Sequence, residues 1–107
     1  MGFSYDKILL ERCKKAIQTV DHSADVILFG SRARGDAEVD SDYDLLILTD
    51  GDAGLKREEA FLRALFPIEM ETGAVLTFLL YRKATWDSPL YNAMPFHCNV
   101  DTEGISL

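Results

Sequence analysis

Two aspartates with one residue between them, Asp42 and Asp44, are the strongest chemical signal in the sequence. Residues two positions apart on a β-strand point to the same face, so the two carboxylates would lie side by side and repel each other. A divalent cation resolves that conflict, because Mg²⁺ prefers hard oxygen ligands. The pair therefore predicts a magnesium site in which both aspartates are ligands.

A Gly-Ser turn, Gly30-Ser31, precedes the aspartates within the stretch 25–50. Its backbone N–H groups and hydroxyl would bind the phosphates that such a cation bridges. Arg32 and Arg34 follow the turn and would supply local positive charge to a nucleotide, although an arginine in a polar loop is as often simply solvated. The stretch predicts a site for a nucleotide and Mg²⁺.

Two strands and a loop must position these residues. The apolar run Val26–Phe29 predicts a buried strand that ends at Gly30. Asp44–Leu48 predicts a second buried strand, closed by a turn at residues 49–52. A polar loop rich in turn formers connects the two strands and runs to Ser41.

Two amphipathic patterns predict helices outside this stretch. The first runs from Tyr5 or Asp6 to about Val20, with apolar residues at helical spacing. The second spans Leu55–Phe66, and we expect Pro67 to end it.

The remainder of the chain alternates between strand and helix signals. Ile68–Thr72 alternates apolar and polar residues, which is typical of a half-exposed strand. Gly73 is then either a turn or a kink before a strongly apolar strand, Ala74–Arg82. Ser88-Pro89 and Met94-Pro95 each predict the start of a short helix. Glu103-Gly104 predicts a helix end, and Ile105–Leu107 a terminal extended segment.

The order of these elements predicts the fold class. Helix, strand, strand, helix, strand and short helices indicate an α/β or α+β fold, with a mixed sheet and helices packed on it. At 107 residues we expect residues 1–107 to form a single domain.

Composition excludes some functions. The net charge of −7 argues against a broad basic surface for nucleic acid. The longest apolar stretch is too short to span a bilayer, and no signal peptide precedes it, so we expect a cytoplasmic protein without membrane contact. Cys13 and Cys98 have no metal-binding spacing and are expected to be reduced thiols.

The motifs together resemble a known family. Residues 30–36, Gly-Ser-Arg-Ala-Arg-Gly-Asp, followed by residues 41–45, Ser-Asp-Tyr-Asp-Leu, are similar to the signature of the nucleotidyltransferase superfamily related to DNA polymerase β. The similarity is greatest to its short members, the minimal nucleotidyltransferases. A lone Asp-x-Asp or Gly-Ser is a weak signal, whereas this order and spacing between two predicted strands is specific.

The resemblance implies a role for each matching residue. Gly30, Ser31 and Arg32 would bind a nucleoside triphosphate, which the resemblance implies is ATP, while Asp42 and Asp44 would be the catalytic residues and hold Mg²⁺. An acceptor hydroxyl would attack the α-phosphate and expel pyrophosphate.

The sequence departs from the family at a third carboxylate. Active members usually carry one on a neighbouring strand, and Thr77 stands at that position here. Glu69 and Glu71 are candidate substitutes, although the solvent-facing side of an edge strand is the favoured interpretation of each. Without a third carboxylate, the stretch predicts nucleotide binding better than it predicts turnover.

Three functions therefore stay open. The first is an enzyme that transfers AMP from ATP to a partner protein, because short family members resemble the antitoxin half of toxin–antitoxin pairs whose partner is a HEPN-domain protein. The second is a degenerate module that binds nucleotide or partner without turnover. The third is a purely structural domain, which leaves the paired aspartates unexplained.

Overall fold

The sheet contains four strands in the order β3-β2-β1-β4. The computed structural model describes residues 5–107. β1 pairs antiparallel with both β2 and β4, whereas β2 and β3 are parallel, so the sheet is mixed and the predicted fold class is confirmed. The strands are β1 (Asp25–Phe29), β2 (Tyr43–Thr49), β3 (Leu76–Arg82) and β4 (Ile105–Ser106).

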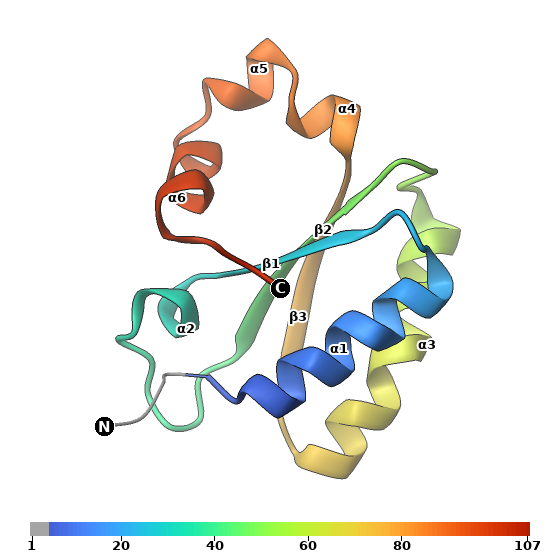
Figure 1. Cartoon of the computed structure of the whole chain (residues 1–107), viewed down its shortest axis with the longest axis vertical. Helices are drawn as coiled ribbons and strands as arrows, with labels where there is room; N and C mark the ends of the chain where they lie inside the picture. The colour runs from blue at the N-terminus through green and yellow to red at the C-terminus, as the bar shows by residue number, and fades with distance from the viewer. Residues whose placement is uncertain (1–4) are drawn as a thin grey trace.

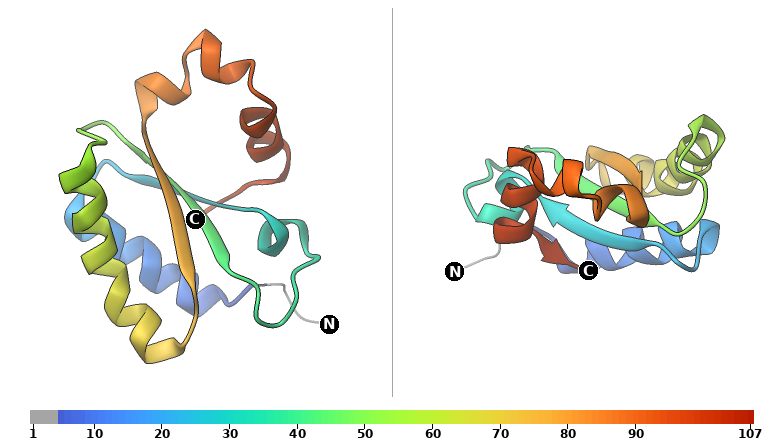
Figure 2. Two further views of the ribbon diagram at one scale, coloured as in Figure 1. Left: turned by 180° about the vertical axis from the view of Figure 1, so that it is seen from behind. Right: turned by 90° about the horizontal axis from the view of Figure 1, so that it is seen from above.

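Helices lie on both sides of the sheet (Figures 1 and 2). The two long helices, α1 and α3, pack side by side on one face, and the three short helices α4 to α6 arch over the other. The short helix α2 connects β1 to the loop before β2. The helices are α1 (Lys7–Val20), α2 (Ser31–Arg34), α3 (Leu55–Thr72), α4 (Lys83–Trp86), α5 (Pro89–Asn92) and α6 (Pro95–Glu103).

β2 is an interior strand and is buried on both faces. Leu45 and Ile47 pack against the buried side chains of α1 and α3. Leu46 and Leu48 point the other way, because side chains alternate along a strand, and they pack against Trp86. This double burial explains why β2 is a continuous apolar run after Asp44.

Most predicted boundaries agree with the structure within two residues. Asp6 caps α1, since its carboxylate accepts hydrogen bonds from the backbone N–H groups of Ile8 and Leu9. Ser88 caps α5, as its sequence context predicted. The helix start at Pro95, the helix end at Glu103 and the final extended segment are also confirmed.

The prediction that Pro67 ends the second helix is wrong. α3 continues through Pro67 to Thr72, and Gly73 ends it in the left-handed conformation, with φ 77°. A proline removes one hydrogen bond from a helix interior. Here the cost is offset because Pro67 lies on the exposed side, whereas Ile68 continues the buried stripe of Phe61 and Leu65.

The predicted strand at Ile68–Thr72 is wrong for the same reason. These five residues are the last turn of α3, and Gly73 is a helix cap, neither a turn between strands nor a kink in one. An alternation over five residues also places positions i and i+4 on one helical face, so the pattern was too short to distinguish the two structures. α2 and α4 lie in segments for which no helix was predicted.

Within the described part of the chain, none of the helices combines the length and apolar character that a membrane crossing requires. Residues 1–4, taken from the sequence as part of the single domain, lie outside the described residues.

A half-buried carboxylate joins three elements at the end of the sheet away from Gly30. Asp21, directly after α1, accepts hydrogen bonds from the Thr49 hydroxyl and from both the backbone N–H and the hydroxyl of Ser23. Nη2 of Arg57, on α3, lies 2.6 Å from the same carboxylate. Burial alone would raise the pKa of Asp21, but these hydrogen bonds and the arginine charge lower it to about 2.

We therefore expect Asp21 to make stability depend on acidity. Its pKa in the folded state is about 2, below the ordinary 3.8, so its contribution is complete above pH 3.8 and is lost as the pH falls through 2. Such a shift corresponds to roughly 2 kcal/mol of unfolding free energy. Asp21→Asn should lose about that amount at pH 7 in urea denaturation and should flatten the decline below pH 4. Asp87→Asn, on the exposed surface, is the control; equal losses in both variants would contradict this role.

Candidate active site

The predicted site residues meet where β1 ends and β2 begins. Phe29 pairs with Asp44 across the two strands, so Gly30, the next residue, lies beside the Asp44 carboxylate. Gly30 has φ 77°, and a Cβ built on it would lie 2.4 Å from Oδ2 of Asp44. Only glycine suits this position, because a side chain would both strain the backbone and displace the carboxylate.

Thr77 holds the other oxygen of that carboxylate. The parallel register of β2 and β3 places Thr77 directly opposite Asp44. The Thr77 hydroxyl donates a hydrogen bond of 2.7 Å to Oδ1 of Asp44 and lies 3.3 Å from the carbonyl oxygen of Tyr43. Asp44 is therefore fixed from both sides, by Thr77 on one strand and by the Gly30 backbone on the other.

Asp42 lies just before β2, two residues from Asp44 and on the exposed surface. Within the described residues its carboxylate makes no hydrogen bond or ion pair. Ser31 is the first residue of α2, and its carbonyl accepts from the N–H groups of Gly35 and Asp36, which closes the helix. The Ser31 hydroxyl thus lies at the start of a short helix, directly after Gly30.

Arg32 holds the loop in place on the opposite side of β2. Its guanidinium donates to the carbonyl oxygens of Ser41 and Val39, with distances of 2.8 and 3.0 Å from Nη2. It also stacks on the ring of Tyr43, 4.3 Å from the ring centre. Tyr43 packs against the α1 side of the sheet, whereas Asp44 points the other way, so Arg32 positions the loop that leads to Asp42.

The two glutamates considered as a third carboxylate belong to the last turn of α3. Oε2 of Glu69 accepts a hydrogen bond of 2.9 Å from the N–H of Leu76, and Glu71 pairs with Arg12 of α1 at 2.5 Å. Among the described residues, no group of three or more histidines, cysteines or acidic residues is placed to hold a metal ion. Thr77 occupies the position opposite Asp44 on β3, and its hydroxyl carries no charge.

The donor set nevertheless fits a divalent cation as a pair of ligands. Both side chains offer hard carboxylate oxygens, both project from the same end of β2, and neither forms an ion pair with a basic group within the described chain. Two carboxylates leave coordination positions for phosphate oxygens and water, which is how Mg²⁺ is usually bound with a nucleotide.

A small groove beside Gly30 was not foreseen from the sequence. It has a volume of about 230 Å³, and α6 contributes Phe96 and Asn99 to its walls, opposite Phe29 and Gly30. Arg34, which also borders it, lies 3.5 Å from the carboxylate of Glu103 on α6. No sequence pattern indicated this contact, because residues distant along the chain meet here only through folding.

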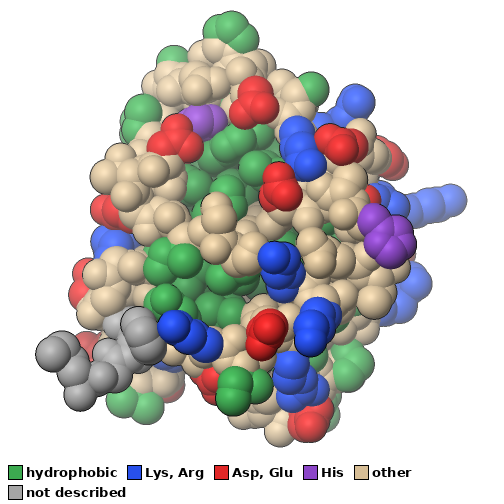
Figure 3. Space-filling model, viewed as in Figure 1, with side chains coloured by type: hydrophobic (Ala, Val, Ile, Leu, Met, Phe, Trp, Pro, Cys, Tyr) green, Lys and Arg blue, Asp and Glu red, His purple; other side chains and the backbone are tan. Residues whose placement is uncertain are grey.

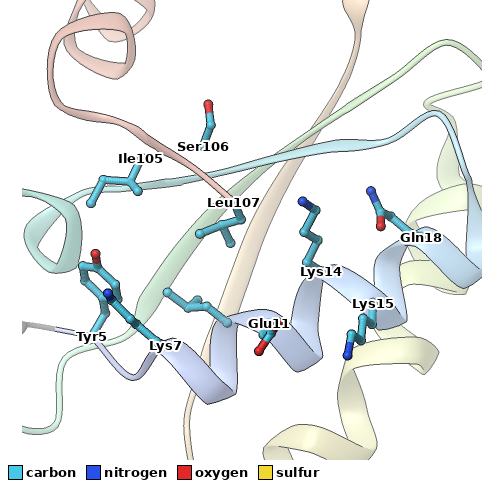
Figure 4. Close-up of a pocket in the computed structure, with 10 residues that line it drawn as sticks. Tyr5, Lys7, Glu11, Lys14, Lys15, Gln18, Ile105, Ser106 and Leu107 are labelled. Atoms are coloured by element: carbon cyan, nitrogen blue, oxygen red, sulfur yellow. The ribbon is translucent and has the colours of Figure 1, made fainter.

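A larger groove lies elsewhere. It has a volume of about 590 Å³ between α1 and β4, and Lys7, Lys14 and Lys15 border an apolar floor that includes Leu10 and Leu107 (Figure 4). Basic side chains gather over this part of the surface (Figure 3). None of the residues predicted for the site lines this groove, so its size does not mark the Asp42–Asp44 site.

The comparisons with known proteins agree with the fold and with the motif. Residues 7–93 match the nucleotidyltransferase domain family, and the chain belongs to that family. A protein of Methanocaldococcus jannaschii described as a putative protein adenylyltransferase is 32% identical over 77 residues, which cover 70% of this chain and 78% of the relative.

Two glycines with the same φ but different ψ are expected to differ in the cost of substitution. Gly30 and Gly73 both have φ 77°, but ψ is −158° at Gly30 and 0° at Gly73, where a Cβ meets no atom within 4 Å. Gly73→Ala should therefore cost only about 1–2 kcal/mol of unfolding free energy, the penalty of the left-handed conformation. Gly30→Ala should cost roughly 1–3 kcal/mol more, because its backbone angles are essentially restricted to glycine and because the new Cβ displaces Asp44. Urea denaturation of both variants tests this; equal losses would contradict the packing of Gly30 on Asp44.

Proposed function

We propose that residues 1–107 form one nucleotidyltransferase domain that transfers AMP from ATP to a hydroxyl group of a partner protein. The observation that carries the proposal is the fixed carboxylate of Asp44, held between Gly30 and Thr77 beside the exposed Asp42. A fixed carboxylate beside a second, exposed carboxylate and a glycine turn supports binding of a nucleoside triphosphate with its cation, because one of the two cation ligands is already in position. A cytoplasmic location, with access to ATP, is part of the proposal.

The roles of the residues follow from their positions. Asp42 and Asp44 would hold Mg²⁺, which supplies charge neutralisation at the phosphates when bound. The Ser31 hydroxyl and the first N–H groups of α2 would donate hydrogen bonds to phosphate oxygens, and Gly30 leaves room for them to approach. Arg32 would contribute by holding the loop before Asp42 and, as the family resemblance implies, by contacting the nucleotide.

The reaction we propose is a single displacement. The acceptor oxygen forms a bond to the α-phosphorus of ATP, the bond from that phosphorus to the bridging α–β oxygen breaks, and pyrophosphate leaves. The acceptor proton passes to solvent, because Thr77 rather than a carboxylate stands beside Asp44. Positioning and electrostatic stabilisation would supply most of the rate acceleration.

The acceptor we propose is a protein of the HEPN type, as in HEPN and minimal nucleotidyltransferase toxin–antitoxin pairs. Asp42 is exposed rather than enclosed, which suits a macromolecular acceptor better than a small molecule that must be buried. The name of the archaeal relative, a protein adenylyltransferase, supports the same choice.

Labelled ATP tests the proposal. The chain, Mg²⁺, ATP labelled on the α-phosphate and the purified product of the neighbouring gene should give a labelled protein. Asp42→Asn and Asp44→Asn should each reduce the labelling at least a hundredfold, because each removes a cation ligand. Asp40→Asn, an exposed aspartate in the same loop, is the matched control and should label normally.

The outcome that would contradict the enzyme is binding without transfer. ATP that binds with Mg²⁺ but never labels the neighbouring product or other acceptor proteins would favour the second candidate, a nucleotide-binding or partner-binding module. The hydrogen bond from Thr77 to Asp44 favours that candidate, since a neutral hydroxyl stands where active family members carry a carboxylate.

Thr77→Asp separates the two candidates. The new carboxylate would lie opposite Asp44 in the register of β2 and β3 and would add a cation ligand. We expect Mn²⁺ binding in the presence of ATP to tighten roughly tenfold, about 1.4 kcal/mol. Transfer that appears only in this variant would identify the natural chain as a binding module. Thr77→Val, which removes the hydroxyl without adding charge, should weaken Mn²⁺ binding and serves as the control.

A further inference from the structure

The outer side of α3 carries a continuous apolar stripe. Leu55, Leu62, Phe66 and Met70 are 71%, 53%, 58% and 70% exposed. Their spacing of seven, four and four residues places them along one side of the helix. None of them belongs to the hydrophobic core, whose α3 residues lie on another side of the helix. An exposed apolar stripe of this length lowers the solubility of a protein unless another surface covers it.

A groove connects this stripe to the proposed site. It has a volume of about 310 Å³ and runs between Leu62 of α3 and the start of β3, where Thr77 and Phe78 form its other wall. Thr77 is the residue that holds Asp44. A molecule lying in the groove would therefore reach the edge of the Asp42–Asp44 site.

β3 itself is an edge strand. Within the described residues it pairs only with β2, and its other side faces solvent beside α3 (Figure 2, left). We call the stripe, the groove and this edge the α3–β3 surface.

The charge of the groove indicates what binds there. Glu58 and Glu59 line it together with the apolar side chains. Glu59 pairs with Arg63 on the outer side of α3, whereas Glu58 forms no ion pair within the described chain. A basic group on a partner would supply the missing counter-charge to Glu58 and would be attracted by a chain of net charge −7.

We propose that the α3–β3 surface docks the acceptor protein through a helix that carries an apolar stripe flanked by basic side chains. The inference rests on the proposed function and names the surface that brings the acceptor to it. A helix fits because the apolar residues of α3 repeat at the spacing that packs against another helix. A second copy of this chain fits less well, because it would bring a further charge of −7 against the acidic groove.

The test measures docking and nucleotide binding separately. The probe is the purified product of the neighbouring gene, and its affinity for the chain is measured by isothermal titration calorimetry. Leu62→Glu combined with Phe66→Glu should weaken that affinity at least about tenfold and reduce labelling in parallel, while Mn²⁺ and ATP bind as before. Leu90→Glu, at a 73% exposed leucine on α5, makes the same change outside the surface and should alter nothing.

Two further variants guard against misfolding and test the charge. Leu62→Ser with Phe66→Ser removes the apolar side chains without adding charge and should also weaken docking. Glu58→Lys should weaken docking several-fold, whereas Glu11→Lys, the same reversal on α1, should not.

The outcomes distinguish this inference from the proposed function. Normal labelling and affinity in the Leu62→Glu, Phe66→Glu variant would overturn the docking surface and leave the enzyme intact. Docking that these variants abolish, with no labelling by the natural chain, would support the surface and contradict the enzyme. A natural chain that does not bind the probe, or that is a dimer which these substitutions dissociate, would also overturn the inference.

Discussion

The parallel pairing of β2 and β3 is the constraint on which the site depends, because it places the Thr77 hydroxyl within hydrogen-bond distance of Asp44. A parallel neighbour requires the chain to cross from the end of one strand to the start of the next, and α3 makes this crossing. The register fixed by the crossover decides which residue stands beside Asp44. A shift of one residue would turn Thr77 away and present an apolar side chain to the carboxylate.

α3 meets this requirement by being longer than its sequence suggests. It passes through Pro67 and ends at Gly73, and the Glu69 side chain then accepts a hydrogen bond from the N–H of Leu76 at the start of β3. The glutamate that was a candidate metal ligand thus stabilises the connection that aligns Thr77 with Asp44. At the other end of the sheet, Asp21 and Arg57 join α1 to α3 and hold the crossover in place.

Local patterns predicted the parts of the fold that local chemistry controls. The apolar runs of β1 and β2, the caps at Asp6 and Ser88, and the Gly30-Ser31 turn all depend on neighbouring residues, and the structure places each near its expected position. Pro67 and the alternation after it led to wrong predictions, because burial of Ile68 outweighed the tendency of proline to end a helix. The hydrogen bond of Thr77, the loop contacts of Arg32 and the groove beside α6 depend on strand register and tertiary packing. No sequence pattern reports those directly.

The central claim is that Asp42 and Asp44, with the Gly30-Ser31 turn, bind a nucleotide with its cation. The most direct measurement is paramagnetic broadening of backbone amide NMR signals as Mn²⁺ and ATP are added to the ¹⁵N-labelled chain. The account predicts that the signals of Gly30, Ser31, Asp42, Asp44 and Thr77 broaden first, and that Asp44→Asn removes the effect. Broadening centred on the groove between α1 and β4, with these signals unchanged, would contradict it.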